Sequence, residues 1–172
     1  PKSGLGVSPD DDFDADAVIR DSLERPTGLC VDPRSGILYV ADPARHRIVT
    51  FRSDGGFAGA FGSRGNRLGE FNFPVSIASG DSFSVVDALN YRIQRLGPSF
   101  TTGMSFGSQG NAIGRFAAPK SVALDSDGDI YVTDALLDNI QIFDPTGRLL
   151  LSVGQRGTKD GAFLSPSGIA IA

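Results

Sequence analysis

The sequence is poor in the residues that most catalytic and metal sites require. Its 172 residues include one cysteine, one histidine, one methionine and no tryptophan. The single Cys30 excludes an internal disulfide and a cysteine zinc cluster within one chain. The single His46 excludes an all-histidine metal site. No run of 18 apolar residues is present, so the sequence predicts no membrane-spanning helix.

Glutamate is also scarce. Glu24 and Glu70 are the only glutamates among 20 acidic residues, and the others are aspartates. Aspartate favours turns and caps, whereas glutamate favours helices. Together with 22 glycines and 10 prolines, this composition predicts short strands joined by tight turns and almost no helix. The formal net charge of -4 disfavours a nucleic-acid partner, which usually requires a basic surface.

The dominant feature that is present is an internal repeat of 45 to 48 residues. It is marked by four prolines at the start of apolar segments: Pro26, Pro74, Pro119 and Pro166. Three further landmarks follow in phase. They are an aspartate after an apolar strand (Asp42, Asp87, Asp134), an Arg-Ile or Asn-Ile pair (Arg47, Arg92, Asn139) and a glycine-rich closing segment that ends in phenylalanine (Phe71, Phe116, Phe163).

Each repeat predicts four short antiparallel strands. The segment 140–143 alternates apolar and polar residues, which is typical of a half-buried strand. Turn sequences such as Asp-Ser-Asp-Gly at 125–128 and Asp-Pro-Thr-Gly at 144–147 separate the strands. A four-stranded unit of this length is typical of a blade of a β-propeller, so we expect an all-β fold.

The repeat resembles the NHL repeat of bacterial proteins. The resemblance rests on Pro-x-Gly-(apolar)-x-x-Asp, on Tyr-Val-x-Asp followed by Arg-Ile-x-x-Phe, and on Phe-Gly-x-x-Gly-x-x-x-Gly-x-Phe. It covers residues 25–172, with departures in the second unit, which lacks the glycine after Pro74, and in the third, which has Asp138-Asn139. The resemblance implies a six-bladed propeller that binds another macromolecule, and it favours an extracytoplasmic location.

We expect an acidic arm over residues 1–24, with an outer blade strand as one alternative for its end, and a propeller segment over 25–172. The blades are expected at about 25–72, 73–117 and 118–164, with the first strand of a fourth at 165–172. Six blades of this period need roughly 280 residues. The chain is therefore expected to be either a fragment of a larger protein or a half-ring that a second copy completes.

Asp42, Asp87 and Asp134 are predicted to have a structural task, because an active site needs only one copy of a residue. We expect their carboxylates to accept hydrogen bonds from backbone N–H groups in the turn that follows each aspartate. Arg47 and Arg92 lie five residues later and are predicted to pair with the carboxylates of their own repeats. Asn139 stands at this position in the third repeat, so no ion pair is expected there.

The loops that follow these aspartates differ between repeats, although they occupy equivalent places. Variable loops on a constant scaffold are how recognition surfaces are built. We therefore predict a binding face for a protein partner, without catalysis and without a cofactor. Its predicted residues are Arg45, His46, Asn90, Tyr91, Leu137 and Asp138.

Other interpretations remain open at this stage. One is a propeller enzyme of the lactonase or lyase type, with metal ligands in a missing half. Another is an RNA-binding NHL domain, which the acidic composition disfavours. The aspartates at 10–16 and those at 125–129 resemble parts of calcium loops, but the former fit a solvated arm and the latter a hairpin turn.

Overall fold

A computed structural model describes residues 23–171. The acidic arm and its outer strand, expected over residues 1–24, lie outside the described part of the chain except for Leu23 and Glu24. Within the described residues, twelve strands form three four-stranded antiparallel sheets, and in each sheet the strands are neighbours in chain order. Two short 3₁₀ segments, η1 at Pro43–Arg45 and η2 at Ala88–Asn90, accompany them.

We call the three sheets blades 1, 2 and 3. Blade 1 contains β1 (Leu29–Val31), β2 (Leu38–Asp42), β3 (Arg47–Phe51) and β4 (Phe57–Phe61). Blade 2 contains β5 (Pro74–Ser79), β6 (Phe83–Asp87), β7 (Arg92–Leu96) and β8 (Gly103–Phe106). Blade 3 contains β9 (Pro119–Leu124), β10 (Ile130–Asp134), β11 (Asn139–Phe143) and β12 (Leu149–Val153).

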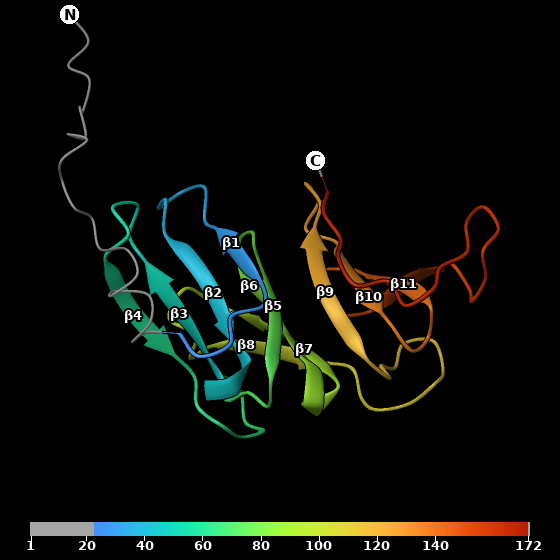
Figure 1. Cartoon of the computed structure of the whole chain (residues 1–172), viewed down its shortest axis with the longest axis horizontal. Helices are drawn as coiled ribbons and strands as arrows, with labels where there is room; N and C mark the ends of the chain where they lie inside the picture. Colours follow the sequence, from blue (N-terminus) through green and yellow to red (C-terminus); the bar gives the residue numbers. More distant parts are fainter. Residues whose placement is uncertain (1–22, 172) are drawn as a thin grey trace, which may run out of the picture.

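The blades follow one another along an arc, with blade 2 between the other two (Figure 1). Apolar side chains fill both junctions. Tyr39 and Ile48 of blade 1 pack with Phe83 and Leu96 of blade 2, and the rings of Tyr39 and Phe83 lie 4.3 Å apart. At the second junction Val86 and Ile93 of blade 2 pack with Val122, Ile130, Val132 and Phe143 of blade 3.

The phenylalanine that ends each closing segment seals these junctions. Phe71 belongs to the first apolar cluster and Phe116 to the second, and both are fully buried. Each of them lies against a glycine of positive φ, Gly62 or Gly107. A β-carbon built on either glycine would come within 2.5 Å of the ring. The Phe-Gly…Phe spacing of the repeat is therefore a packing requirement.

Blades 1 and 3 each have one sheet face that the described residues leave uncovered. On blade 1, Leu29 and Val31 are 66% and 56% exposed, and a largely apolar groove of about 510 Å³ lies beside them. Residues 165–171 are not assigned to a strand, although the repeat predicts the first strand of a fourth unit there. A strand is defined by pairing with a neighbour, and no described segment pairs with these residues. The described part of the chain contains no helix long and apolar enough to cross a membrane.

Candidate functional site: the loop face and the turn face

The connections between strands lie on two opposite edges of the blades, as Figure 1 shows for blade 1. We call one edge the loop face. It carries the loops between the second and third strands (43–46, 88–91 and 135–138) and the closing loops (62–73, 107–118 and 154–165). We call the other edge the turn face. It carries the hairpin turns at 32–37, 52–56, 80–82, 97–102, 125–129 and 144–148.

Charge is divided unequally between the two faces. The loop face carries six cationic residues (Arg45, Arg64, Arg67, Arg115, Arg156 and Lys159) and three acidic ones (Glu70, Asp138 and Asp160). The turn face carries three arginines (Arg34, Arg52 and Arg148) and seven aspartates (Asp32, Asp54, Asp81, Asp125, Asp127, Asp129 and Asp144). The whole chain is acidic, but its loop face carries more cationic than acidic residues.

The three repeated aspartates hold the backbone of the loop face in place. Asp42, Asp87 and Asp134 are completely buried. Each accepts hydrogen bonds from the backbone just before the first strand of its own blade. Asp87 accepts from the Asn72 backbone N–H at 2.6 Å, and Asp134 accepts from the backbone N–H groups of Ala117 and Ala118 at 2.7 and 3.0 Å. The aspartate thus fixes where each blade begins. The predicted bonds to the following turn are present for Asp134, but the Asp42 and Asp87 side chains do not cap the 3₁₀ segments that follow them, because their carboxylates bind the preceding segment and an arginine instead.

Arginines pair with two of these carboxylates. The Nε atom of Arg47 lies 3.3 Å from Asp42, and that of Arg92 lies 2.8 Å from Asp87. Arg92 also donates to the backbone oxygens of Asn66, Arg67 and Glu70 in the closing loop of blade 1. Within residues 23–171, no cationic side chain pairs with Asp134, which accepts from backbone N–H groups instead, including those of Leu136 and Leu137.

Three of the six predicted binding residues share an unusual backbone conformation. His46, Tyr91 and Asp138 have φ values of 53°, 54° and 52°, in the left-handed region that residues other than glycine seldom adopt. The Nδ1 atom of His46 accepts a hydrogen bond from the Phe73 backbone N–H at 3.1 Å. The Asp138 Oδ1 atom accepts one from the Ser165 backbone N–H at 2.7 Å. Both side chains therefore connect their blade to the segment that begins the next repeat.

The other three predicted residues also make contacts within the chain. Arg45 forms an ion pair with Glu24 at 3.2 Å. Asn90 donates hydrogen bonds to the Gly65 backbone oxygen and to Asp87, both at 2.8 Å. Leu137 is half-buried. These contacts give Arg45, His46, Asn90 and Asp138 a structural role, and the role of all six residues in binding stays a prediction.

Sequence reasoning gave too little weight to the exposed aliphatic residues of the loop face. Leu89 and Leu136 occupy equivalent positions and are 52% and 71% exposed. Leu68 and Ile113 occupy equivalent positions in the closing loops and are 38% and 63% exposed. Their recurrence at fixed repeat positions was a readable signal, but only the structure shows that the described residues leave them exposed.

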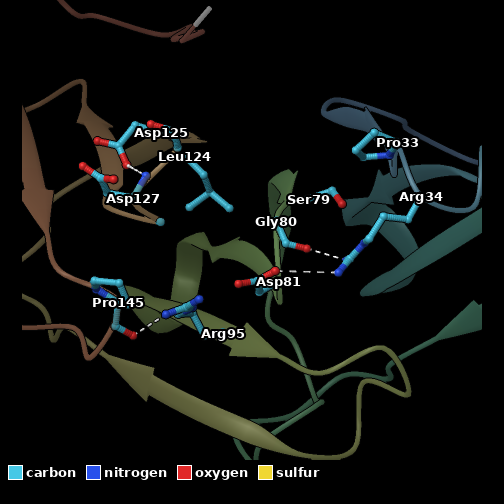
Figure 2. A pocket seen from close by; sticks show the side chains of 12 residues that line it. Pro33, Arg34, Ser79, Gly80, Asp81, Arg95, Leu124, Asp125, Asp127 and Pro145 are labelled. Carbon is cyan, nitrogen blue, oxygen red and sulfur yellow. Dashed lines mark hydrogen bonds and ion pairs between the residues drawn. The ribbon is translucent and has the colours of Figure 1, made fainter.

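On the turn face, the hairpin turns of all three blades surround a cavity of about 380 Å³ (Figure 2). Arg34 of blade 1 donates to the Gly80 backbone oxygen of blade 2. Arg95 of blade 2 donates through Nη1 to the Pro145 backbone oxygen of blade 3. These two arginines join neighbouring blades, and their guanidinium groups line the cavity together with Asp81, Asp125 and Asp127.

The aspartates at 125–129 form the turn that their sequence suggested. The Oδ1 atom of Asp125 accepts from the backbone N–H groups of Asp127 and Asp129 at 3.0 and 2.9 Å. Burial, followed by the negative charges of Asp125 and Asp127, raises the pKa of Asp129. Within residues 23–171, no group of three or more histidine, cysteine, aspartate or glutamate residues has the geometry to hold a metal ion. The aspartates at 10–16 lie outside the described residues.

Comparison with known proteins agrees with the arrangement of the chain in repeated four-stranded blades. The family model of the NHL repeat matches residues 23–51. The chain carries an NHL repeat. A 65-residue stretch of the chain is 34% identical to the human E3 ubiquitin-protein ligase NHLRC1, which corresponds to 38% of the chain and 16% of the relative. The same stretch length is 32% identical to the rat protein of that name.

Solved structures extend the likeness to nearly the whole described chain. Virginiamycin B lyase from Staphylococcus aureus aligns with 84% of this chain at a TM-score of 0.61 and 16% identity. A chain of the nidogen–laminin complex aligns with 76% at a TM-score of 0.59 and 19% identity. These alignments cover 45% and 47% of those chains, so this chain spans less than half of each. They confirm the expected propeller fold.

Proposed function

We propose that this NHL-repeat propeller segment is a non-catalytic scaffold that binds a protein partner through its loop face. The observation that carries the proposal is the set of exposed aliphatic residues on that face, Leu68, Leu89, Ile113 and Leu136. Exposed aliphatic side chains grouped at one edge are typical of protein interaction sites. They stand on a framework fixed by buried aspartates, so the surface is organised before a partner arrives.

The surrounding charges specify the partner further. Arg64, Arg67 and Arg115 are exposed in the same closing loops as Leu68 and Ile113. Arginine is favoured at protein interfaces because its guanidinium group forms bidentate bonds with carboxylates. A partner segment that combines apolar and acidic residues therefore matches this face.

Single-stranded RNA matches it less well. Recognition of RNA bases relies on exposed aromatic rings for stacking. The large exposed apolar residues of the loop face are leucine and isoleucine, whereas Phe71 and Phe116 are buried and Tyr91 is half-buried. The nidogen–laminin structure shows that a propeller chain of similar fold occurs in a complex between proteins. That likeness supports protein binding as a proposal for this chain.

The test is site-specific crosslinking in the protein's native cells. A photoreactive amino acid is placed at position 89 or 136, on the loop face, and at position 54, on the turn face, as the control. We expect a discrete protein adduct from positions 89 and 136 that position 54 does not form. The adduct should disappear when Leu136→Asp is combined with crosslinking from position 89.

Two results would overturn the proposal. One is an adduct that is digested by ribonuclease, which would assign the face to RNA. The other is an identical set of adducts from the loop face and the turn face, which would mean that the loop face has no preferred partner. Thermal unfolding of the Leu136→Asp variant provides the folding control, because Leu136 is 71% exposed and its substitution should leave stability unchanged.

A further inference from the structure

The cavity on the turn face does not depend on the loop face or on its partner. It is bounded by residues of all three blades, and Figure 2 shows Arg34 and Asp81 on one side, Asp125 and Asp127 on the other, and Arg95 near Pro145. Its volume of about 380 Å³ falls within the range of small-ligand sites, which is roughly 300–1,000 Å³. Its walls are formed by hairpin turns and by the strand residues Ser79, Arg95 and Leu124.

The guanidinium group of Arg95 is incompletely satisfied. Its Nη1 atom donates to the Pro145 backbone oxygen. Its Nε atom is buried and has no hydrogen-bond partner within the described residues. A buried donor without an acceptor is costly, and such groups in folded proteins usually mark a functional or solvent contact. The part of the Arg95 guanidinium group that a cavity ligand can reach is the part that lines the cavity, and a carboxylate is the acceptor that a guanidinium group binds most strongly.

A simple anion, however, would meet unfavourable charge. Asp127 and Asp81 line the same cavity. Within residues 23–171, no group donates a hydrogen bond to the carboxylate of Asp127. The accumulation of negative charge at this turn is also felt by Asp129, whose pKa is raised by burial and by Asp125 and Asp127. A ligand with an ammonium group near these aspartates would neutralise them. The cavity therefore favours a molecule that carries both signs of charge.

We propose that the turn-face cavity binds a small zwitterion of the size of a free dipeptide. Its carboxylate accepts a hydrogen bond from Arg95, and its ammonium group lies beside Asp127. The side chain of Leu124, which also lines the cavity, supplies an apolar wall for the ligand's aliphatic part. Arg34 is held by Gly80, Asp32 and Asp81, so it shapes the wall and is not needed as a ligand contact.

The proposal is tested by calorimetric titration of the protein with alanyl-alanine and its two capped derivatives. N-acetyl-alanyl-alanine lacks the ammonium group, and alanyl-alanine amide lacks the carboxylate. We expect the free dipeptide to bind at least tenfold more tightly than either derivative. No measurable binding of the free dipeptide, or equal binding of all three compounds, would overturn the proposal.

Two variants locate the binding site. Arg95→Gln removes the guanidinium group and should abolish the preference for the free dipeptide over its amide. Asp127→Asn should abolish the preference over the acetylated compound. The controls are Arg52→Gln and Asp54→Asn, which remove exposed charges from the turn at 52–56 of the same face, outside the cavity, and should change neither preference.

Arg95 also contacts Pro145, so its variant is checked separately for folding by thermal unfolding. Asp127→Asn carries the test if Arg95→Gln does not fold, because Asp127 is exposed at a turn. If the control variants weaken binding as much as Arg95→Gln and Asp127→Asn do, the interaction is a general effect of face charge and the assigned site is wrong.

Discussion

The imidazole Nδ1 atom of His46 accepts a hydrogen bond from the backbone N–H of Phe73, 3.1 Å away and 27 residues later in the sequence. In blade 3, Asp138 makes the equivalent bond to Ser165. Two chemically different side chains thus perform the same task at the same repeat position. The task is to hold the start of the next repeat against the loop face.

This relationship predicts how position 46 tolerates substitution. His46→Asn should leave stability nearly unchanged, because asparagine accepts the left-handed backbone and provides an oxygen acceptor, as Asp138 does. His46→Ala should cost about 1 kcal/mol or more, because the Phe73 N–H loses its partner and alanine is strained at this φ. Urea unfolding monitored by circular dichroism measures both. Equal destabilisation by the two substitutions would show that the hydrogen bond is unimportant.

The buried pair of Asp87 and Arg92 predicts a larger effect. Asp87→Asn should destabilise the protein by about 3 kcal/mol or more, because it leaves the Arg92 guanidinium, whose side chain is 13% exposed, without its carboxylate. Asp54→Asn, at an exposed ion pair on the turn face, should cost about 0.5 kcal/mol or less. The comparison uses denaturant midpoints. A small effect at Asp87 would mean that the Arg92 bonds to closing-loop carbonyl groups suffice.

Two glycines of positive φ form a matched pair for a packing test. Gly107→Ala would place a β-carbon 2.5 Å from the Phe116 ring, whereas nothing lies within 4 Å of the same atom at Gly36. Both substitutions incur left-handed backbone strain of about 1 kcal/mol. Gly107→Ala should add the cost of displacing a fully buried ring, for a total above about 3 kcal/mol. The difference between the two melting temperatures therefore measures the cost of the contact between the added β-carbon and the Phe116 ring.

Cys30 should react slowly in the folded protein. Burial at the junction of blades 1 and 2, with a smaller contribution from the negative charge of Asp32, raises the pKa of its thiol from 9.0 to about 12. Three pKa units lower the thiolate fraction at pH 8 about a thousandfold relative to the unfolded chain, and the thiolate is the reactive form. Alkylation by iodoacetamide, followed by mass spectrometry with and without urea, measures this ratio.

The same shift gives a pH dependence of stability. The folded protein keeps the Cys30 thiol protonated up to about pH 12. The contribution of this thiol to the free energy of unfolding is therefore fully present below the pKa of the unfolded chain, near 9, and is lost as the pH rises from 9 to 12. Cys30→Ala should therefore flatten the decline in unfolding free energy between pH 9 and pH 12. An unchanged decline in the variant would assign it to other groups.

The repeat made most of the fold predictable. Pro26, Pro74 and Pro119 mark where blades begin, and Asp42 and Asp87 could be paired with Arg47 and Arg92 because all four recur in phase. The candidate site was less accessible to sequence reasoning. His46 and Asp138 differ between blades and therefore looked variable enough to bind a partner, but both make a backbone contact with the next repeat that only coordinates reveal.

The turn-face cavity could not be predicted for a related reason. Arg34 and Asp127 occupy equivalent positions in the first hairpin turns of their repeats, but their charges are opposite, and Arg95 lies in a different strand. No shared residue type therefore marks the cavity in the sequence. The three residues meet only because neighbouring blades stack at a fixed distance. Sequence periodicity reports what every blade needs, whereas a site used once is built from the positions at which the blades differ.

The buried phenylalanines of the closing loops have one further consequence. Phe71 seals the first junction and Phe116 seals the second in the same manner, so blade 2 presents to each neighbour the surface that the other blades already accept. Blade 2 is therefore a unit that can be removed or repeated. A gene that lost residues 73–117, or duplicated them, would still encode matching surfaces at every remaining junction. Chains of this kind can therefore grow or shrink in steps of about 45 residues without a new core having to evolve.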